Sequence, residues 1–389
     1  MGGGGSHMSE YQYYEFAAID RSLSQAEMAH LRAVSTRAMI TPASFVNHYQ
    51  WGNLKANPSD WMRRYFDAFV YSANWCSCQL ALRIPLTTFR KAELEPYESA
   101  CTLSIDESQT HWIFNWHLNE SLDDTRFAID DGSGWMIRLV PLREELLRGD
   151  LRPLYLGWLA GAVEEDDTVL EPEVPPGLAD LSPAQQALME FLEINPDLLA
   201  AAAIGSADVS SAGANEHRHV NAWLETCSDA DMKAVFKQIA TGKGREAERW
   251  VHSHYNAWLH TQRPTLPSNA PRRTVAELYV LAEAAAVQRQ EREAQAAKER
   301  AAEQQRLREA HLRQIMAEAR THWEAADAHA RRGGASGYDQ ARTIIGELAD
   351  GYALTSSHAA FERDLQQFLT PHSKRRALVR RLAEAGLCK

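Results

Sequence analysis

Apolar and polar residues alternate along several short stretches of the first 140 residues, a pattern typical of β-strands that bury one face. The clearest stretch is 111–118, where Trp112, Phe114 and Trp116 alternate with mostly polar neighbours. Aromatic content favours a strand at 11–19 as well. The pattern therefore predicts strands at residues 11–19, 44–49, 80–84, 103–105, 111–118 and 135–139.

Apolar residues spaced three and four apart predict helices between these strands. Ser24 and Glu27 match a capping box, in which each side chain binds a backbone N–H at the start of a helix. A second helix is expected from Ser59 to Ala73, and a third begins near Pro141. Helices mixed with strands that are joined by short turns predict an α+β domain with a mixed or mainly antiparallel sheet.

An acidic and proline-rich segment follows this domain. Residues 164–167 read Glu-Glu-Asp-Asp, and residues 172–176 contain three prolines. This composition is typical of a linker between domains. Beyond it the pattern predicts only helices, of which the first begins at Ser182-Pro183 with an N-cap serine and a first-turn proline.

Residues Thr274 to Ala330 are predicted to form one long helix, about 85 Å in length at the usual helical rise. Its centre, 288–306, consists of Gln, Glu, Arg, Lys and Ala. A helix that is polar on every side has no face to bury, so we expect a solvated arm or a weak coiled-coil seam. After Arg-Arg-Gly-Gly at 331–334, helical spacing of apolar residues predicts a small bundle whose last helix ends at Gly386.

The predicted fold is thus an α+β domain followed by an all-α region with a long solvated helix. The Gly/Ser-rich start is typical of an expression tag, so the natural chain is expected to begin at Met8. The predicted divisions are a tag at 1–7, an acidic, aromatic-rich α+β domain at 8–165, a linker at 166–180, a helical domain at 181–270, the long charged helix at 271–332 and a basic helical bundle at 337–389.

Composition and cysteine usage indicate the cellular compartment in which the protein is found. No apolar run approaches the roughly 18 residues that a membrane helix needs, and the residues after the tag do not resemble a secretory signal. The five cysteines are odd in number and scattered, which fits a reducing compartment better than a disulfide framework. These features predict a cytoplasmic protein that is not inserted in a membrane.

Charge is distributed unevenly along the chain. Of the formal net charge of −11, residues 8–167 carry −9, from 14 Lys/Arg and 23 Asp/Glu, whereas residues 271–389 carry +4, from 20 and 16. An acidic first domain repels phosphate, so nucleic acid is not the favoured partner. If nucleic acid is bound, the candidate contacts lie at the basic end, where a solvated helix terminus is the alternative interpretation. The candidate residues are Lys374, Arg375, Arg376, Arg380 and Arg381.

Two cysteines form the candidate metal site. Cys76 and Cys78 precede a predicted strand, in which side chains two residues apart point the same way. Structural zinc needs four ligands, so Cys101 or His111 would have to complete the site, and buried structural cysteines are the alternative. No Gly-x-Ser-x-Gly elbow is present. The sequence therefore predicts no catalytic residue and no cofactor.

Several segments resemble a family of uncharacterised bacterial proteins. They are the opening Tyr-Gln-Tyr-Tyr-Glu-Phe-Ala-Ala-Ile-Asp at 11–20, the Ala/Glu/Arg-rich arm, Tyr-Asp-Gln-Ala at 338–341 and Arg-Arg-Ala-Leu-Val-Arg-Arg-Leu-Ala-Glu-Ala-Gly-Leu at 375–387. The resemblance spans nearly the whole chain, but its motifs are architectural. Members are often encoded beside SWIM zinc-finger proteins, so it implies such a protein as a candidate partner and implies no activity. This chain lacks the Cys-x-His half of a SWIM finger, because Cys101 is followed by Thr-Leu.

The favoured functional hypothesis is a non-catalytic bacterial scaffold or regulatory protein that acts through a partner protein. A solvated arm supports it, because such a helix spaces or presents something else. The first alternative is a nucleic-acid-binding accessory factor that uses the basic bundle. The second is a metal-dependent or hydrolytic enzyme in the first domain, for which the sequence offers the least support.

Overall fold

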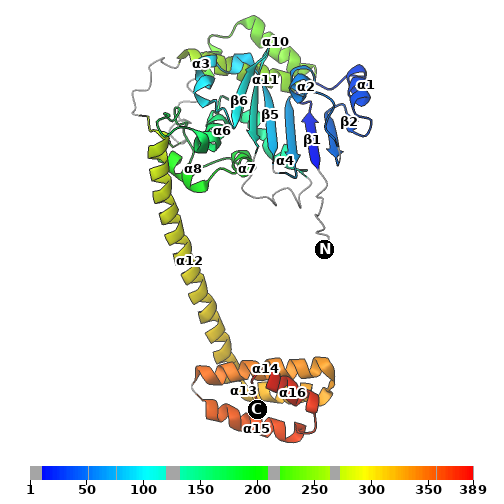
Figure 1. The fold of residues 1–389 in the computed structure, drawn as a ribbon, viewed down its shortest axis with the longest axis vertical. Helices are drawn as coiled ribbons and strands as arrows, with labels where there is room; N and C mark the ends of the chain where they lie inside the picture. The colour runs from blue at the N-terminus through cyan, green and yellow to red at the C-terminus, as the bar shows by residue number, and fades with distance from the viewer. Residues whose placement is uncertain are drawn as a thin grey trace, which may run out of the picture. The chain divides into compact units, whose positions relative to one another are not determined.

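The computed structural model describes residues 11–50, 52–75, 77–119, 132–208, 220–262, 272–355 and 357–388. The chain divides into two compact units, Met1–Val287 and Gln288–Lys389. The first unit is α+β and the second is helical, as predicted. Figure 1 shows both units, with many of their elements labelled.

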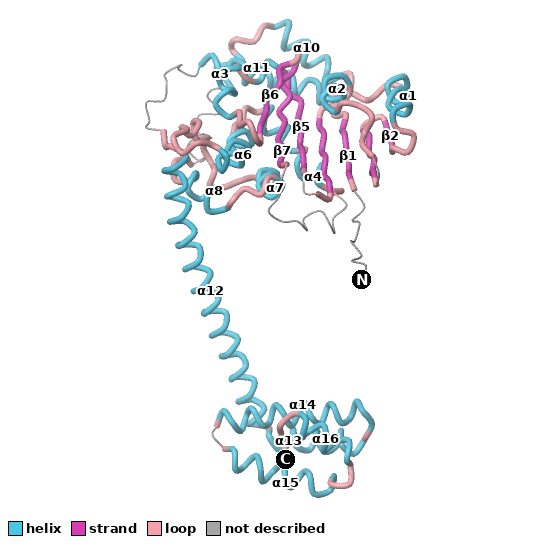
Figure 2. Tube along the Cα trace, viewed as in Figure 1, coloured by secondary structure: helices cyan, strands magenta, loops and turns pink. Residues whose placement is uncertain are grey.

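The first unit is built on a seven-stranded sheet with the order β2-β3-β1-β4-β5-β7-β6, whose strands lie side by side in Figure 2. The strands are β1 Gln12–Ala17, β2 Met39–Thr41, β3 Ser44–Tyr49, β4 Ala68–Ala73, β5 Cys78–Pro85, β6 Leu103–Glu107 and β7 His111–Leu118. Each of these pairings is antiparallel, which confirms the mainly antiparallel prediction. In the register of β5 and β7, Leu82 lies opposite Phe114.

Helices cover the centre of this sheet on both faces. The helices of the first unit are α1 Gln25–Val34, α2 Pro58–Arg64, α3 Lys91–Leu94, α4 Trp135–Leu139, α5 Pro141–Leu147, α6 Arg152–Gly161, α7 Pro183–Phe191, α8 Pro196–Ala203, α10 Asp229–Ala240 and α11 Gly244–Gln262, with short 3₁₀ turns at η1 Leu86–Thr88, η2 Glu95–Tyr97 and η3 Ala162–Glu164. On one face, Phe69 of β4 packs in a cluster with residues of α1 and α2. On the other, Val70 packs in a larger cluster with residues of α4 to α8. Each fully buried side chain of this size contributes roughly 1.5–3 kcal/mol, so the two clusters hold the unit together.

The capping box predicted for α1 is present. Ser24 Oγ accepts the N–H of Glu27 at 3.2 Å, and the carboxylate of Glu27 accepts the N–H of Ser24 at 2.8 Å. Hydrogen bonds from Arg21 and from the Ser24 backbone lower the pKa of Glu27 to about 2. The helix start is therefore fixed by side chains adjacent to it in the sequence.

Two predicted elements are wrong. The helix expected from Ser59 to Ala73 ends at Arg64, and its second half is the strand β4, whose Val70 and Phe69 are buried on opposite faces of the sheet. The strand expected at 135–139 is the helix α4, which buries Trp135, Met136 and Leu139 and leaves Ile137 77% exposed. Residues 59–73 keep helical spacing throughout, because β4 is buried on both faces and does not alternate, whereas 135–139 fits either spacing. Tertiary packing decides the structure in both cases.

The first unit includes the segment expected to link two domains. Leu159 before that segment and Leu188 after it belong to one hydrophobic cluster, which also contains Leu278 from the start of α12 (Val275–Ala317). Residues 166–180 thus run between parts of a shared core. The division into compact units falls further along, between Val287 and Gln288, inside α12.

The second unit closes a helical core of its own. Besides the end of α12 it contains α13 Ala319–Arg332, α14 Gly334–Leu354, α15 His358–His372 and α16 Arg376–Glu384. The long helix predicted from Thr274 to Ala330 is therefore two helices. They meet at Glu318, whose N–H bonds the carbonyl of Ile315 at 3.1 Å, and the turn buries Ile315 and Ala326 in the same core. Across the described residues of both units, no helix is long and apolar enough to cross a membrane.

Candidate functional site

The basic residues predicted as a nucleic-acid contact lie on and just before α16, and two of them are neutralised by carboxylates. Nε of Arg381 lies 3.1 Å from Asp339 Oδ1 on α14, and Nε of Arg380 lies 3.5 Å from Glu384 Oε1 on α16 itself. Ion pairs of this kind compete with any phosphate for the guanidinium. The remaining three residues are Lys374, Arg375 and Arg376.

Arg375 lies against the end of α13, far from it in the sequence. Its Nη1 approaches the hydroxyl of Tyr338 at 3.4 Å, and its Nη2 approaches the carbonyl oxygen of Arg331 at 3.5 Å. The structure thereby brings Arg332, which is exposed, next to the predicted cluster. The sequence analysis missed Arg332, because residues 331–334 were interpreted only as a break between helices.

The structure describes one of the two candidate metal-binding cysteines. Cys78 is buried in β5, and its thiol donates to the carbonyl oxygen of Phe191 at 3.2 Å. Cys76 lies outside the described residues. Within the described part of the chain, no three His, Cys, Asp or Glu side chains are grouped so that they could hold a metal ion.

A cluster of buried charges, which the sequence analysis missed, lies at one end of the sheet. Arg83 donates to Asp67 Oδ1 through Nε at 3.1 Å and Nη2 at 2.5 Å, and the other oxygen of Asp67 accepts the N–H groups of Ile19 and Asp20. Arg143 donates to Asp20 at 2.8 Å and to the carbonyl oxygen of Arg83 at 3.0 Å. These are structural ion pairs that join β1, β4, β5 and α5.

The electrostatics of this cluster favour charged aspartate. Burial by itself raises the pKa of Asp67, but the charge of Arg83, the N–H of Asp20, the charge of Arg143 and the N–H of Ile19 outweigh it, so the pKa lies below its ordinary value. Asp67 therefore remains an anion that accepts hydrogen bonds at neutral pH. It lacks the raised pKa that a general acid would need.

A second buried ion pair anchors the start of α12 to the first unit. Arg273 donates to both carboxylate oxygens of Glu171, at 2.7 and 2.8 Å, and to the carbonyl oxygens of Ala201 and Ala202 at the end of α8. Glu171 also accepts the hydroxyl of Tyr155. The first turn of α12 is thus held by a bidentate pair whose carboxylate is almost completely buried.

The middle of α12 has the opposite character. From Val287 to Arg308 every side chain is exposed apart from Ala296, which is partly exposed. Ion pairs along the helix are short-range and exposed, such as Arg289 with Glu293 at 3.1 Å. This confirms the sequence-based prediction of a long helix that is solvated on every side.

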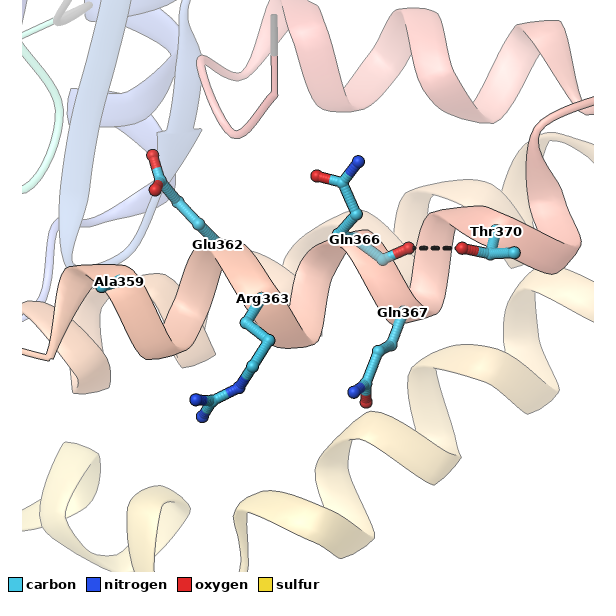
Figure 3. A pocket seen from close by; sticks show the side chains of 6 residues that line it. All are labelled: Ala359, Glu362, Arg363, Gln366, Gln367 and Thr370. Carbon is cyan, nitrogen blue, oxygen red and sulfur yellow. Dashed lines mark hydrogen bonds between the residues drawn. The ribbon is translucent and has the colours of Figure 1, made fainter.

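Two hollows lie on the surface of the second unit. In the second unit, a groove of about 560 Å³ lies between α13 and α15, lined in part by Trp323, Asp364 and Phe368. A second depression, of about 420 Å³, lies along α15. Figure 3 shows the residues that line it, among them Thr370, whose hydroxyl donates to the carbonyl oxygen of Gln366 at 2.8 Å. Because that hydroxyl is bonded to its own helix, it is not presented as a nucleophile.

An exposed apolar face lies on α10 in the first unit. None of its residues is buried, and Phe236 and Ile239, one helical turn apart, are 69% and 54% exposed. Large apolar side chains gathered on one face are typical of an interaction surface. This face was not predicted as a binding site, although the spacing of its apolar residues was visible in the sequence.

Comparisons with protein-family models, with curated proteins and with solved structures find no match to this chain.

Proposed function

We propose that this chain is a non-catalytic bacterial connector, which binds a partner protein and links two folded units through a solvated helix. The exposure of residues 287–308 carries the proposal. A helix of about 22 residues that buries almost nothing gains little stability from packing, so its use is to link other parts. Both of its ends are fixed, at the start by Arg273 and Glu171 and at the end by the core around Ile315.

The apolar face of α10 supports a protein as the partner. Phe236 and Ile239 are both more than half exposed on one face of α10, and a contiguous exposed apolar patch is typical of a protein interaction site. The resemblance noted in the sequence makes a SWIM zinc-finger protein the first candidate to test. The proposal includes neither a reaction nor a cofactor.

The proposal is tested by shortening the link. Deletion of residues 291–304 removes two heptads, about 21 Å of helix, and shifts the helical phase by only about 40°. The full chain should capture one partner in stoichiometric amount from the native bacterium and re-form the complex from purified components. The deletion should leave thermal unfolding of both units unchanged and weaken the assembled complex at least tenfold.

The matched control replaces 291–304 with a scrambled sequence of the same composition, which keeps the length and the helical propensity. This control should bind like the natural chain. Equal assembly by the deletion variant would contradict a linking role. Turnover of a substrate by the purified chain without any partner would contradict the non-catalytic part of the proposal.

A further inference from the structure

Four cations lie where the end of α13 meets the start of α16, and none of them has a carboxylate partner among the described residues. Arg332 ends α13, Lys374 and Arg375 lie just before α16, and Arg376 is its first residue. Arg332, Lys374 and Arg376 are exposed, and Arg375 is partly buried. We call these four residues the basic surface.

Two chain segments form this surface, and Arg375 connects them. Its guanidinium contacts the carbonyl oxygen of Arg331 and the hydroxyl of Tyr338, which are neutral groups that orient it and leave its charge in place. A Cβ atom placed on Gly333 would lie 3.6 Å from Nη1 of Arg375. The backbone on both sides of Arg332 thus lies against Arg375, so the basic surface is continuous.

Nearby acidic residues are too few to neutralise the region. Asp327 pairs with Arg331 at 2.8 Å, Asp339 with Arg381, and Glu384 with Arg380. Three carboxylates therefore account for three arginines. The four residues of the basic surface remain as a net charge of +4 in a chain whose formal net charge is −11.

The apolar side chains of α16 are not available to bind lipid. Leu378 and Leu382 are fully buried in the core of the bundle. Among the described residues after 357, no large apolar side chain is exposed. A helix that lies in a membrane interface needs an exposed apolar face. The apolar face of α16 is instead buried in the core of the bundle.

We propose that the basic surface binds the phosphate backbone of a nucleic acid. A cluster of cations without carboxylate partners and without an exposed apolar side chain fits a solvated polyanion, and the negative charge elsewhere on the chain confines the contact to this surface. Binding through phosphates carries no base specificity. This site is additional to the linking role proposed above and does not depend on it.

The test measures the salt dependence of binding. With a short labelled DNA duplex and fluorescence anisotropy, four phosphate contacts predict a slope of about −3.6 for log affinity against log salt. Affinity should therefore fall roughly a hundredfold between about 50 and 200 mM NaCl. The triple variant R332A/K374A/R376A should reduce the slope to about −1. R376K, which keeps the charge, should leave the slope unchanged.

The matched control removes the same charge elsewhere. R292A/K298A/R300A takes three exposed cations from the middle of α12, so net charge changes equally and the basic surface stays intact. This control should keep most of the affinity. Both triple variants should melt like the natural chain, since the substituted side chains are exposed.

Three outcomes would overturn the proposal. One is the absence of duplex binding at about 50 mM salt. Another is a control variant that weakens binding as much as the basic-surface variant. The third is binding to phosphatidylserine vesicles that excess DNA does not displace, which would assign the surface to a membrane.

Discussion

Asp67 and Arg83 form a deeply buried ion pair in the first unit, with side chains 0% and 9% exposed. Taking charges out of water is costly, and the cost is offset only while every lone pair has a donor. Here Asp67 receives two N–H groups from the end of β1 in addition to the guanidinium of Arg83. One carboxylate therefore joins three strands, and the pair is more sensitive to change than a surface pair.

We expect Asp67→Asn to lower the free energy of unfolding of the first unit by about 3–5 kcal/mol, because Arg83 would remain buried without a counter-ion. Chemical denaturation followed by the tryptophans of the first unit measures this change. Glu190→Gln, at the exposed pair with Arg138, is the control and should cost at most about 1 kcal/mol. Equal effects of the two substitutions would contradict the structural role of Asp67.

The free energy of unfolding should also depend on Asp67 through its pH dependence in the acid range. Because the folded pKa of Asp67 lies below its unfolded value of about 3.9, its contribution is fully present above that value and is lost as pH falls through the folded pKa. Asp67→Asn should flatten this part of the stability curve. A variant curve parallel to the natural one throughout the acid range would show that Asp67 does not titrate as described.

At the scale of elements, the start of α12 depends on Arg273. Its guanidinium donates hydrogen bonds to both carboxylate oxygens of Glu171 and to the last carbonyl groups of α8. The planar guanidinium of arginine fits this geometry, whereas the ammonium group of lysine does not. Backbone bonds between Glu171 and Arg273 and between Val169 and Val275 add to the attachment. The helix is thus anchored before its exposed part begins.

Arg273→Ala should destabilise this attachment by roughly 3 kcal/mol, since a buried carboxylate loses its counter-ion while part of the arginine is exposed. Amide hydrogen exchange of residues 274–286 should become faster, whereas exchange in β5 and β7 should not change. Arg273→Lys should give an intermediate effect. Unaltered exchange at 274–286 in both variants would show that the ion pair does not hold the helix.

Sequence patterns predicted the strands whose two faces carry different kinds of residue, and failed in β4, where apolar residues line both faces. The strands β5 and β7 alternate visibly, and both predictions are confirmed. In β4, Phe69 and Val70 are buried on opposite faces of the sheet, so no alternation remains and the helical spacing of α2 continues into the strand. The break at Glu318 has neither Gly nor Pro to signal it.

The candidate sites show the same limit. The cluster at Lys374 to Arg376 was visible because its residues are adjacent in the sequence. Arg332 was not, because its place beside Arg375 follows from the packing of α13 and α14. Asp20 and Arg143 lie 123 positions apart in the sequence, and no local sequence pattern predicts such a contact.

At the scale of the whole molecule, each compact unit has its own hydrophobic packing, with two clusters in the first unit and one in the second, and the unit boundary lies within one helix. The exposed part of α12 contains alternating positive and negative residues, whose pairs at three- and four-residue spacing each contribute only a few tenths of a kcal/mol. Its solvation could be predicted from composition alone, because residues 288–306 contain no apolar side chain larger than that of Ala. Every proposal about linking depends on that solvation.

The solvation of the middle of α12 is tested most directly by a nitroxide scan. A nitroxide-bearing residue is placed at each position from 294 to 300 in turn, and its mobility is read by electron paramagnetic resonance, with buried Ala326 as the immobile reference. We predict high mobility and solvent access at all seven positions, with no periodicity. Immobilised labels recurring every three to four residues would show that one face of this helix is covered, and would contradict the account.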